Sequence, residues 1–202
     1  MGIIKLNNRG MRSATDIGGT TSLGTWTFIS KTTASSDATV SIASGIDSTY
    51  KLYVITCKNI HPETTNSEFR INFRDGGSAY DATKTTTFVK SRHAENDAVA
   101  ATVYDDGGDL AESTGGHLLM ENVGADNDAS CSGIIYLFDP SSTTFVKHFI
   151  TDFNSSSGDN SSDHIQVAGY CNVTAAIDGV QFSFSADSIQ SGTIKLYGLG
   201  DS

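Results

Sequence analysis

Apolar and polar residues alternate with a period of two along much of this chain. Phe69, Ile71 and Phe73 alternate with polar neighbours, and the segments 145–150 and 180–185 follow the same rhythm. Successive side chains of a β-strand point to opposite faces of a sheet, so this alternation predicts strands buried on one face. The chain shows no apolar stripe at i, i+3, i+4 and i+7 typical of a helix. We therefore expect a fold built from strands.

Turn-forming residues separate about ten to twelve predicted strands. The clearest turn signals lie at residues 75–77, 105–108, 115–116, 139–140, 178–179 and 191–192. The unbroken apolar run at 134–138 predicts a central strand covered on both faces. The expected strands lie near residues 25–30, 38–43, 50–58, 67–74, 84–91, 99–104, 116–121, 130–138, 144–152, 164–172, 179–185 and 192–198.

The segments between these strands are too short for the crossover helices that parallel strands need. The sheets should therefore be antiparallel. We predict an all-β fold, an antiparallel two-sheet β-sandwich of jelly-roll type over residues 25–202, preceded by an extended N-terminal arm.

The balance of charges limits the possible partners. The chain has 13 basic and 23 acidic residues, which gives a formal net charge of −10 at pH 7. A nucleic-acid groove needs a cationic surface, so no nucleic-acid partner is expected. No stretch approaches the ~18 apolar residues of a membrane span, so no membrane insertion is expected either.

Residues 1–24 differ from the rest because they are polar and rich in glycine. The apolar run near the start is far shorter than the core of a secretory signal, so we expect synthesis in the cytoplasm. The segment is either a disordered tail or an arm that orders against a partner. As an assembly anchor it would use Ile3, Ile4, Leu6, Arg9 and Arg12.

Catalytic and metal-binding motifs are missing from the sequence. It contains no nucleophile elbow, phosphate-binding loop, HExxH motif or dinucleotide fingerprint. The histidines show no short ligand spacing, so no zinc site is expected. We expect His148 and His164 to lie on a solvent-facing strand surface. The three cysteines, Cys57, Cys131 and Cys171, are odd in number and far apart in the sequence. We therefore predict that each is a small, buried hydrophobic side chain.

Acidic loops are weak candidates for calcium. Calcium prefers six to eight oxygen ligands, and carboxylates cluster at Asp105, Asp106, Asp109, Asp126 and Asp128. None of these clusters matches the EF-hand loop, and Asp and Asn also favour turns for conformational reasons. Solvated turns are the alternative interpretation.

A polysaccharide-directed activity is a further alternative. Glycoside hydrolysis needs two carboxyl groups beside an aromatic-lined groove, yet the glutamates lie mainly near loops or strand ends. Loop aromatics such as Tyr80 or Tyr104 would serve a binding module by stacking on sugars.

Several separate blocks of the sequence together carry a resemblance to a known protein family. The run Ile-Asp-Gly-Val-Gln-Phe at 177–182 leads to Ser-Gly-Thr-Ile-Lys-Leu-Tyr-Gly at 191–198. Further blocks lie at 44–58, at 69–77 with Tyr80, and at 139–142 with 145–147. Together they resemble the virion structural proteins of marine tailed bacteriophages, a β-sandwich family of the tail-fibre or adhesin region or of head decoration. The resemblance covers about residues 25–199 and is least for the N-terminal segment.

This resemblance implies a non-enzymatic structural component on the surface of the virion, with no catalytic residues and no cofactor. Its expected partners are other virion proteins and further copies of itself, with a trimer favoured. The alternative is a carbohydrate-binding, receptor-recognition module of a tail fibre that contacts a host surface glycan. A polysaccharide hydrolase is less favoured.

Overall fold

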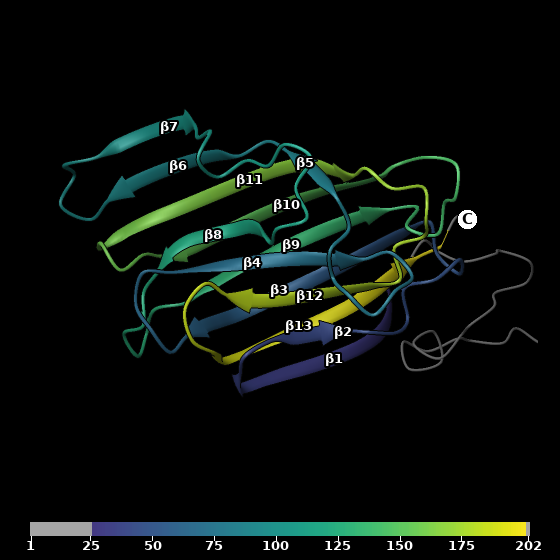
Figure 1. The fold of residues 1–202 in the computed structure, drawn as a ribbon. Coiled ribbons are helices and arrows are strands. Elements are labelled where there is room, and N and C mark those ends of the chain that lie inside the picture. The colour runs from purple at the N-terminus through teal and green to yellow at the C-terminus, as the bar shows by residue number, and fades with distance from the viewer. Residues whose placement is uncertain (1–25, 201–202) are drawn as a thin grey trace, which may run out of the picture.

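The computed structural model describes residues 26–200, which form strands and no helix (Figure 1). The strands are β1 (Trp26–Asp37), β2 (Val40–Ile42), β3 (Leu52–Pro62), β4 (Ser67–Arg74), β5 (Lys84–Thr86), β6 (Val89–Ala94), β7 (Ala100–Tyr104), β8 (His117–Val123), β9 (Cys131–Phe138), β10 (Lys147–Ser156), β11 (Ser161–Cys171), β12 (Gly179–Phe184) and β13 (Ile189–Leu199). The predicted arm, residues 1–24, lies outside the described residues.

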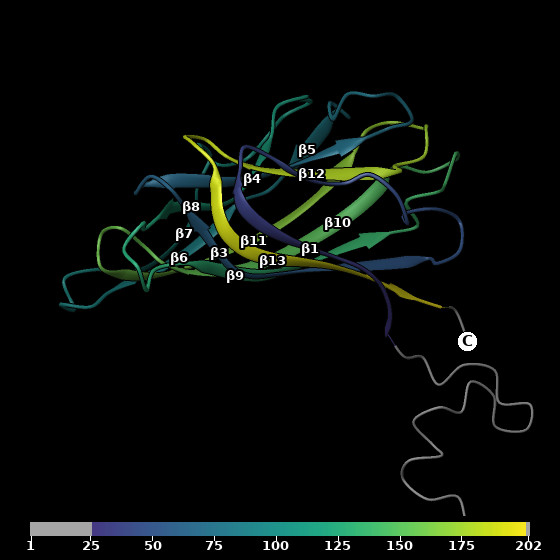
Figure 2. The same cartoon turned by 90° about the horizontal axis from the view of Figure 1, so that it is seen from below.

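Two sheets pack face to face as a β-sandwich, and every strand pairing within them is antiparallel. The large sheet has nine strands in the order β1-β13-β3-β9-β10-β11-β6-β7, with β5 paired to β11. The small sheet has four strands in the order β2-β12-β4-β8. Figure 2 shows the two layers, with β4 and β12 above β3, β9 and β13. An all-β fold with two antiparallel sheets is thus confirmed.

The alternating residues of both sheets meet in the core between them. Phe69 and Phe73 of β4 are buried, as predicted from their spacing. Their rings contact the large sheet: the centroid of Phe73 lies 4.9 Å from that of Phe149, and Phe69 lies 6.0 Å from Phe153. Such aromatic contacts add to the hydrophobic stabilisation of the buried surface.

The small sheet does not cover the whole large sheet. Its edge strand β8 packs against β10 and β11, whereas β6 and β7 lie beyond it (Figure 1). All five residues of β7 are exposed, and β7 forms one edge of the large sheet. The β6–β7 hairpin is therefore paired through backbone hydrogen bonds but has little cover on its faces.

Three sequence predictions are wrong in detail. The predicted strand 84–91 is two strands, β5 and β6, because Phe88 turns into the core between them. The turn predicted at 191–192 lies inside β13, where a register shift and the positive φ of Gly192 (140°) form a bulge in a continuous strand. The apolar run 134–138 is a central strand, but its outer face is open: Phe138 is 37% exposed.

Strand boundaries also differ from the predictions. β1 runs on to Asp37 and β3 to Pro62, because each pairs along nearly its whole length with the long strand β13. In contrast, the segment predicted at 144–152 enters the sheet only at Lys147 and continues to Ser156. Phe145 lies before the strand and is exposed.

Candidate functional site

The outer face of the large sheet has a continuous apolar row at one end. Pairing places Phe28 of β1 beside Tyr197 of β13, Tyr197 beside Val54, and Val54 beside Tyr136 of β9. Tyr136 in turn lies beside Ile150 of β10. Residues of this row on β3, β9, β10 and β13 point away from the sandwich core, because their alternating neighbours on the same strands are buried between the sheets. Four strands, β1, β13, β9 and β10, thus contribute to a single outer surface, whereas Val54 of β3 in the same row is only 1% exposed.

We call this surface the apolar face and define it by Trp26, Phe28, Tyr136, Phe138, Ile150 and Tyr197. The ring centroids of Trp26 and Phe28 lie 5.6 Å and 5.9 Å from that of Tyr197, which gives a small aromatic cluster at the β1 edge. Phe28 is 56% exposed and Ile150 is 47% exposed. Large contiguous apolar patches of this kind mark interaction sites in soluble proteins.

A groove of about 440 Å³ opens at the β10–β11 end of the apolar face. Phe138, Ile150 and Tyr170 line it, and threonines of the β5 region form its rim. His148 lies beside Tyr170, with their ring centroids 6.0 Å apart. The groove is lined mainly by aromatic and aliphatic side chains, so it suits an apolar side chain better than a charged ligand.

The other end of the same outer face is polar. His164 Nε2 lies 2.9 Å from Asp152 Oδ1, and Gln166 donates to Asp152 Oδ2 at 3.2 Å. Partial burial acts to raise the pKa of Asp152, but these hydrogen bonds outweigh it and hold the pKa below its ordinary value. His148 and His164 thus lie on the outer strand surface, as predicted. The outer face is amphipathic along its strands.

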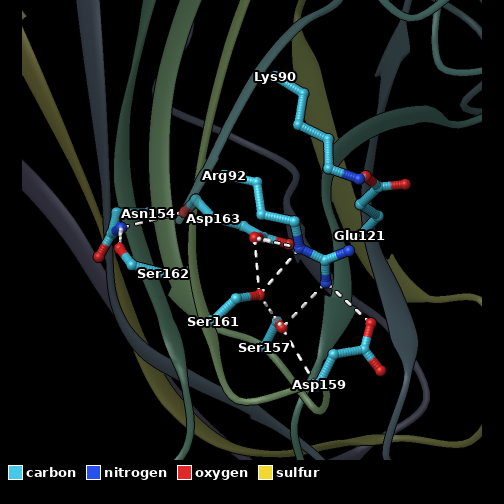
Figure 3. A network of polar contacts seen from close by, with 9 residues as sticks. All are labelled: Lys90, Arg92, Glu121, Asn154, Ser157, Asp159, Ser161, Ser162 and Asp163. Atoms are coloured by element: carbon cyan, nitrogen blue, oxygen red, sulfur yellow. Dashed lines mark hydrogen bonds and ion pairs between the residues drawn. The ribbon is translucent and has the colours of Figure 1, made fainter. Parts of the chain in front are cut away.

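A network of polar contacts joins β6 to β11 and to the turn between β10 and β11 (Figure 3). Arg92 Nε lies 3.0 Å from Oδ1 of the fully buried Asp163, and Arg92 Nη2 lies 2.8 Å from Oδ2 of the exposed Asp159. Ser161 Oγ donates to the same Asp163 oxygen at 3.0 Å. In Figure 3 the two carboxylates flank the guanidinium from different sides. Because Arg92 is already paired twice, the network supports the hairpin and offers no free cation.

An ion pair beside this network joins the two sheets. Lys90 of β6 pairs with Glu121 of β8 (Figure 3). Glu68, which lies on β4, pairs with Arg70 of the same strand. Both carboxylates thus lie against a cation.

Buried basic groups lie between the sheets at the other end of the sandwich. Lys84, Lys147 and His117 are all fully buried. Lys147 Nζ donates to the carbonyl of Val173 at 2.8 Å, and His117 Nδ1 lies 3.3 Å from Thr86 Oγ1. Burial, reinforced by the charge of Lys84, lowers the pKa of His117 to about 3, so its imidazole is neutral.

The acidic calcium candidates lie in two separate loops. Asp105, Asp106 and Asp109 follow β7, and Asp126 and Asp128 follow β8. The Asp105 carboxylate accepts a hydrogen bond from the Gly107 amide at 3.0 Å, and the Asp126 carbonyl accepts one from Ala129 at 2.8 Å. Within residues 26–200, no three His, Cys, Asp or Glu side chains are grouped so that they could hold a metal ion. Calcium binding by these loops stays a prediction.

The loop aromatics weighed for glycan binding lie on different elements. Tyr80, between β4 and β5, has its ring 5.5 Å from the Arg74 guanidinium. Tyr104, at the end of β7, is exposed, and its hydroxyl donates to Asp109. Neither belongs to the groove on the apolar face.

The three cysteines are free and buried, as predicted: Cys57, Cys131 and Cys171. Burial raises the pKa of all three thiols. Sequence reasoning missed the apolar face and the buried Lys84, Lys147 and Asp163. Lys147 and Asp163 each had a local signal, since Lys147 alternates in phase with Phe149, and Asp163 with Ile165.

Comparisons of this chain with protein families, with curated proteins and with solved structures found no match. Over residues 26–200, no helix has the length and apolar character needed to span a membrane.

Proposed function

We propose that this chain is a non-enzymatic structural component of a tailed-bacteriophage virion, exposed on the particle surface as a capsid decoration or as part of the tail or fibre. The proposal includes a sandwich of jelly-roll type and a homo-oligomer, with a trimer favoured. It also includes residues 1–24 as the anchoring arm. The resemblance over residues 25–199 supports the virion role, and the observation that supports the homo-oligomer is the exposed apolar face.

We assign the covering partner to residues 1–24 of a neighbouring copy of this chain. The described residues begin at Trp26, which is itself part of the apolar face and is 47% exposed. Twenty-four extended residues span up to about 80 Å, which is enough to reach an adjacent copy. Ile3, Ile4 and Leu6 supply the apolar side chains for the groove.

Charge also favours this partner. Residues 1–24 contain three basic residues and one acidic residue, whereas the whole chain has 13 basic and 23 acidic residues. A cationic arm is attracted to an acidic sandwich, and Arg9 and Arg12 would supply that attraction. An exchanged arm links each copy to the next, which is a low-cost route to a closed oligomer.

The test compares the full chain with a variant that lacks residues 1–24, using light scattering after gel filtration. The full chain should be oligomeric and the truncated chain monomeric. A synthetic peptide of residues 1–24 should bind the truncated chain, and Ile150→Ser should weaken this binding by at least tenfold. Val103→Ser is the matched control, because both side chains are 47% exposed but Val103 lies on β7, outside the apolar face.

A monomeric full chain, or peptide binding that is equal in both variants, would refute the arm exchange. The virion role is tested separately. Mass spectrometry of purified particles made from the genome that encodes this chain should detect it in stoichiometric amounts. Particles without it would refute the role.

One observation favours carbohydrate binding as a second candidate function. Exposed aromatic rings, including Tyr104 and those of the groove, offer stacking surfaces for sugars. A glycan array probed with the full chain tests this alternative, and the release of reducing ends from bound polysaccharide would identify a hydrolase. Neither signal is expected from a purely structural component.

A further inference from the structure

A buried lysine and an asparagine meet where the two sheets join. Lys84 is the first residue of β5 in the large sheet, and Asn72 belongs to β4 in the small sheet. Lys84 Nζ donates to Asn72 Oδ1 at 2.6 Å and to the carbonyl of Ala82 at 2.9 Å. Within residues 26–200, Lys84 makes no ion pair with a carboxylate. Its amine is thus held by neutral oxygens alone.

This environment favours the uncharged amine. Burial, opposed in part by Cys171 and Asp81, lowers the pKa of Lys84 to about 8. Roughly a tenth of the molecules then have a neutral amine at pH 7, a far larger share than for an exposed lysine. A neutral lysine amine is a nucleophile, and a desolvated one is the usual form in which enzymes employ it.

We infer that Lys84 and Asn72 form an intramolecular isopeptide bond that ties the large sheet to the small one. In this reaction the neutral Nζ attacks the Asn72 amide carbon Cγ, and the Nζ–Cγ bond forms. A proton passes from Nζ to Nδ2, the Cγ–Nδ2 bond breaks, and ammonia leaves. The products are a secondary amide and one molecule of ammonia, so no oxidant or cofactor is required.

The surroundings of the pair suit this chemistry. The amine is already in contact with the amide it would attack, so the reaction needs no encounter between distant groups. Lys84 is fully buried, whereas Asn72 is only partly buried, which gives ammonia a path to solvent. The two residues are 12 positions apart and lie in different sheets, so the bond would cross-link the sandwich covalently.

The experiment is a denaturing mass measurement of the full chain, both freshly purified and after incubation at mildly alkaline pH. The expected mass is about 17 Da below the sequence mass, because one ammonia is lost. Trypsin should then fail to cut after Lys84. The digest should contain residues 71–74 joined to residues 75–90.

Two variants serve as controls. Lys84→Arg should keep the full sequence mass, because a guanidinium does not attack the amide. Lys147→Arg should retain the loss, because the Lys147 amine contacts a backbone carbonyl and no side-chain amide. The wild-type peptide map decides the question if a variant does not fold.

A full-mass chain in both samples, with ordinary cleavage after Lys84, would overturn the inference. A loss of ammonia that maps to another asparagine, as a succinimide, would overturn it as well. The result does not depend on the oligomeric state, so it is separate from the test of arm exchange.

Discussion

Replacing Arg92 by methionine should destabilise the protein strongly, although Arg92 is a polar residue near the surface. The change leaves the fully buried Asp163 carboxylate with a hydrogen bond from Ser161 and no cation. Breaking a buried ion pair by removing one partner costs about 3–5 kcal/mol. With an m-value of about 2 kcal/mol/M for urea, the midpoint of unfolding should fall by about 2 M.

The exposed half of the same network is the control. Asp159→Ala removes the other carboxylate that pairs with Arg92, but this carboxylate is in contact with solvent. An exposed pair contributes about 0–1 kcal/mol, so the midpoint should hardly move. The double variant Arg92→Met with Asp163→Leu removes both charges of the pair. It should regain at least half of the stability that Arg92→Met alone loses. Equal midpoint shifts for Arg92→Met and Asp159→Ala would refute this reasoning.

Three further predictions concern the core. Phe69→Ala should lower the free energy of unfolding by about 3–5 kcal/mol in urea titrations, because Phe69 is fully buried among aromatic rings of both sheets. In the unfolded chain His117 has its ordinary pKa of 6.5, whereas in the folded protein its pKa is about 3. Between these two pH values only the unfolded chain binds the proton, so the free energy of unfolding should decrease as the pH falls from 6.5 to about 3. His117→Gln should flatten that dependence by up to about 1.4 kcal/mol per pH unit. Native protein should resist thiol alkylation, while urea should expose all three buried thiols: Cys57, Cys131 and Cys171.

The sequence predicts the core of this fold better than its surface. Alternation at Phe69, Ile71 and Phe73 identifies the buried face, because the period of a strand is a local property. It does not tell whether the opposite face is covered. The outer face of β9 is open because the small sheet lies on the other side, which depends on how distant strands pack.

The candidate sites were harder to predict for the same reason. The apolar face needs residues of four strands in register, and no single segment contains its pattern. Arg92 and Asp163 are 71 positions apart, so their pairing has no local signal. Lys84 appears in a polar, threonine-rich segment whose sequence gives no sign of burial.

The uncovered β6–β7 hairpin also has a dynamic consequence. β7 pairs with a single neighbour and has no buried residue, so it is held mainly by backbone hydrogen bonds that water can reach. Segments of this kind open at a lower free energy than the global unfolding of the molecule. The amide hydrogens of β7 should therefore exchange with deuterium well before those of β3 and β9, in the centre of the same sheet.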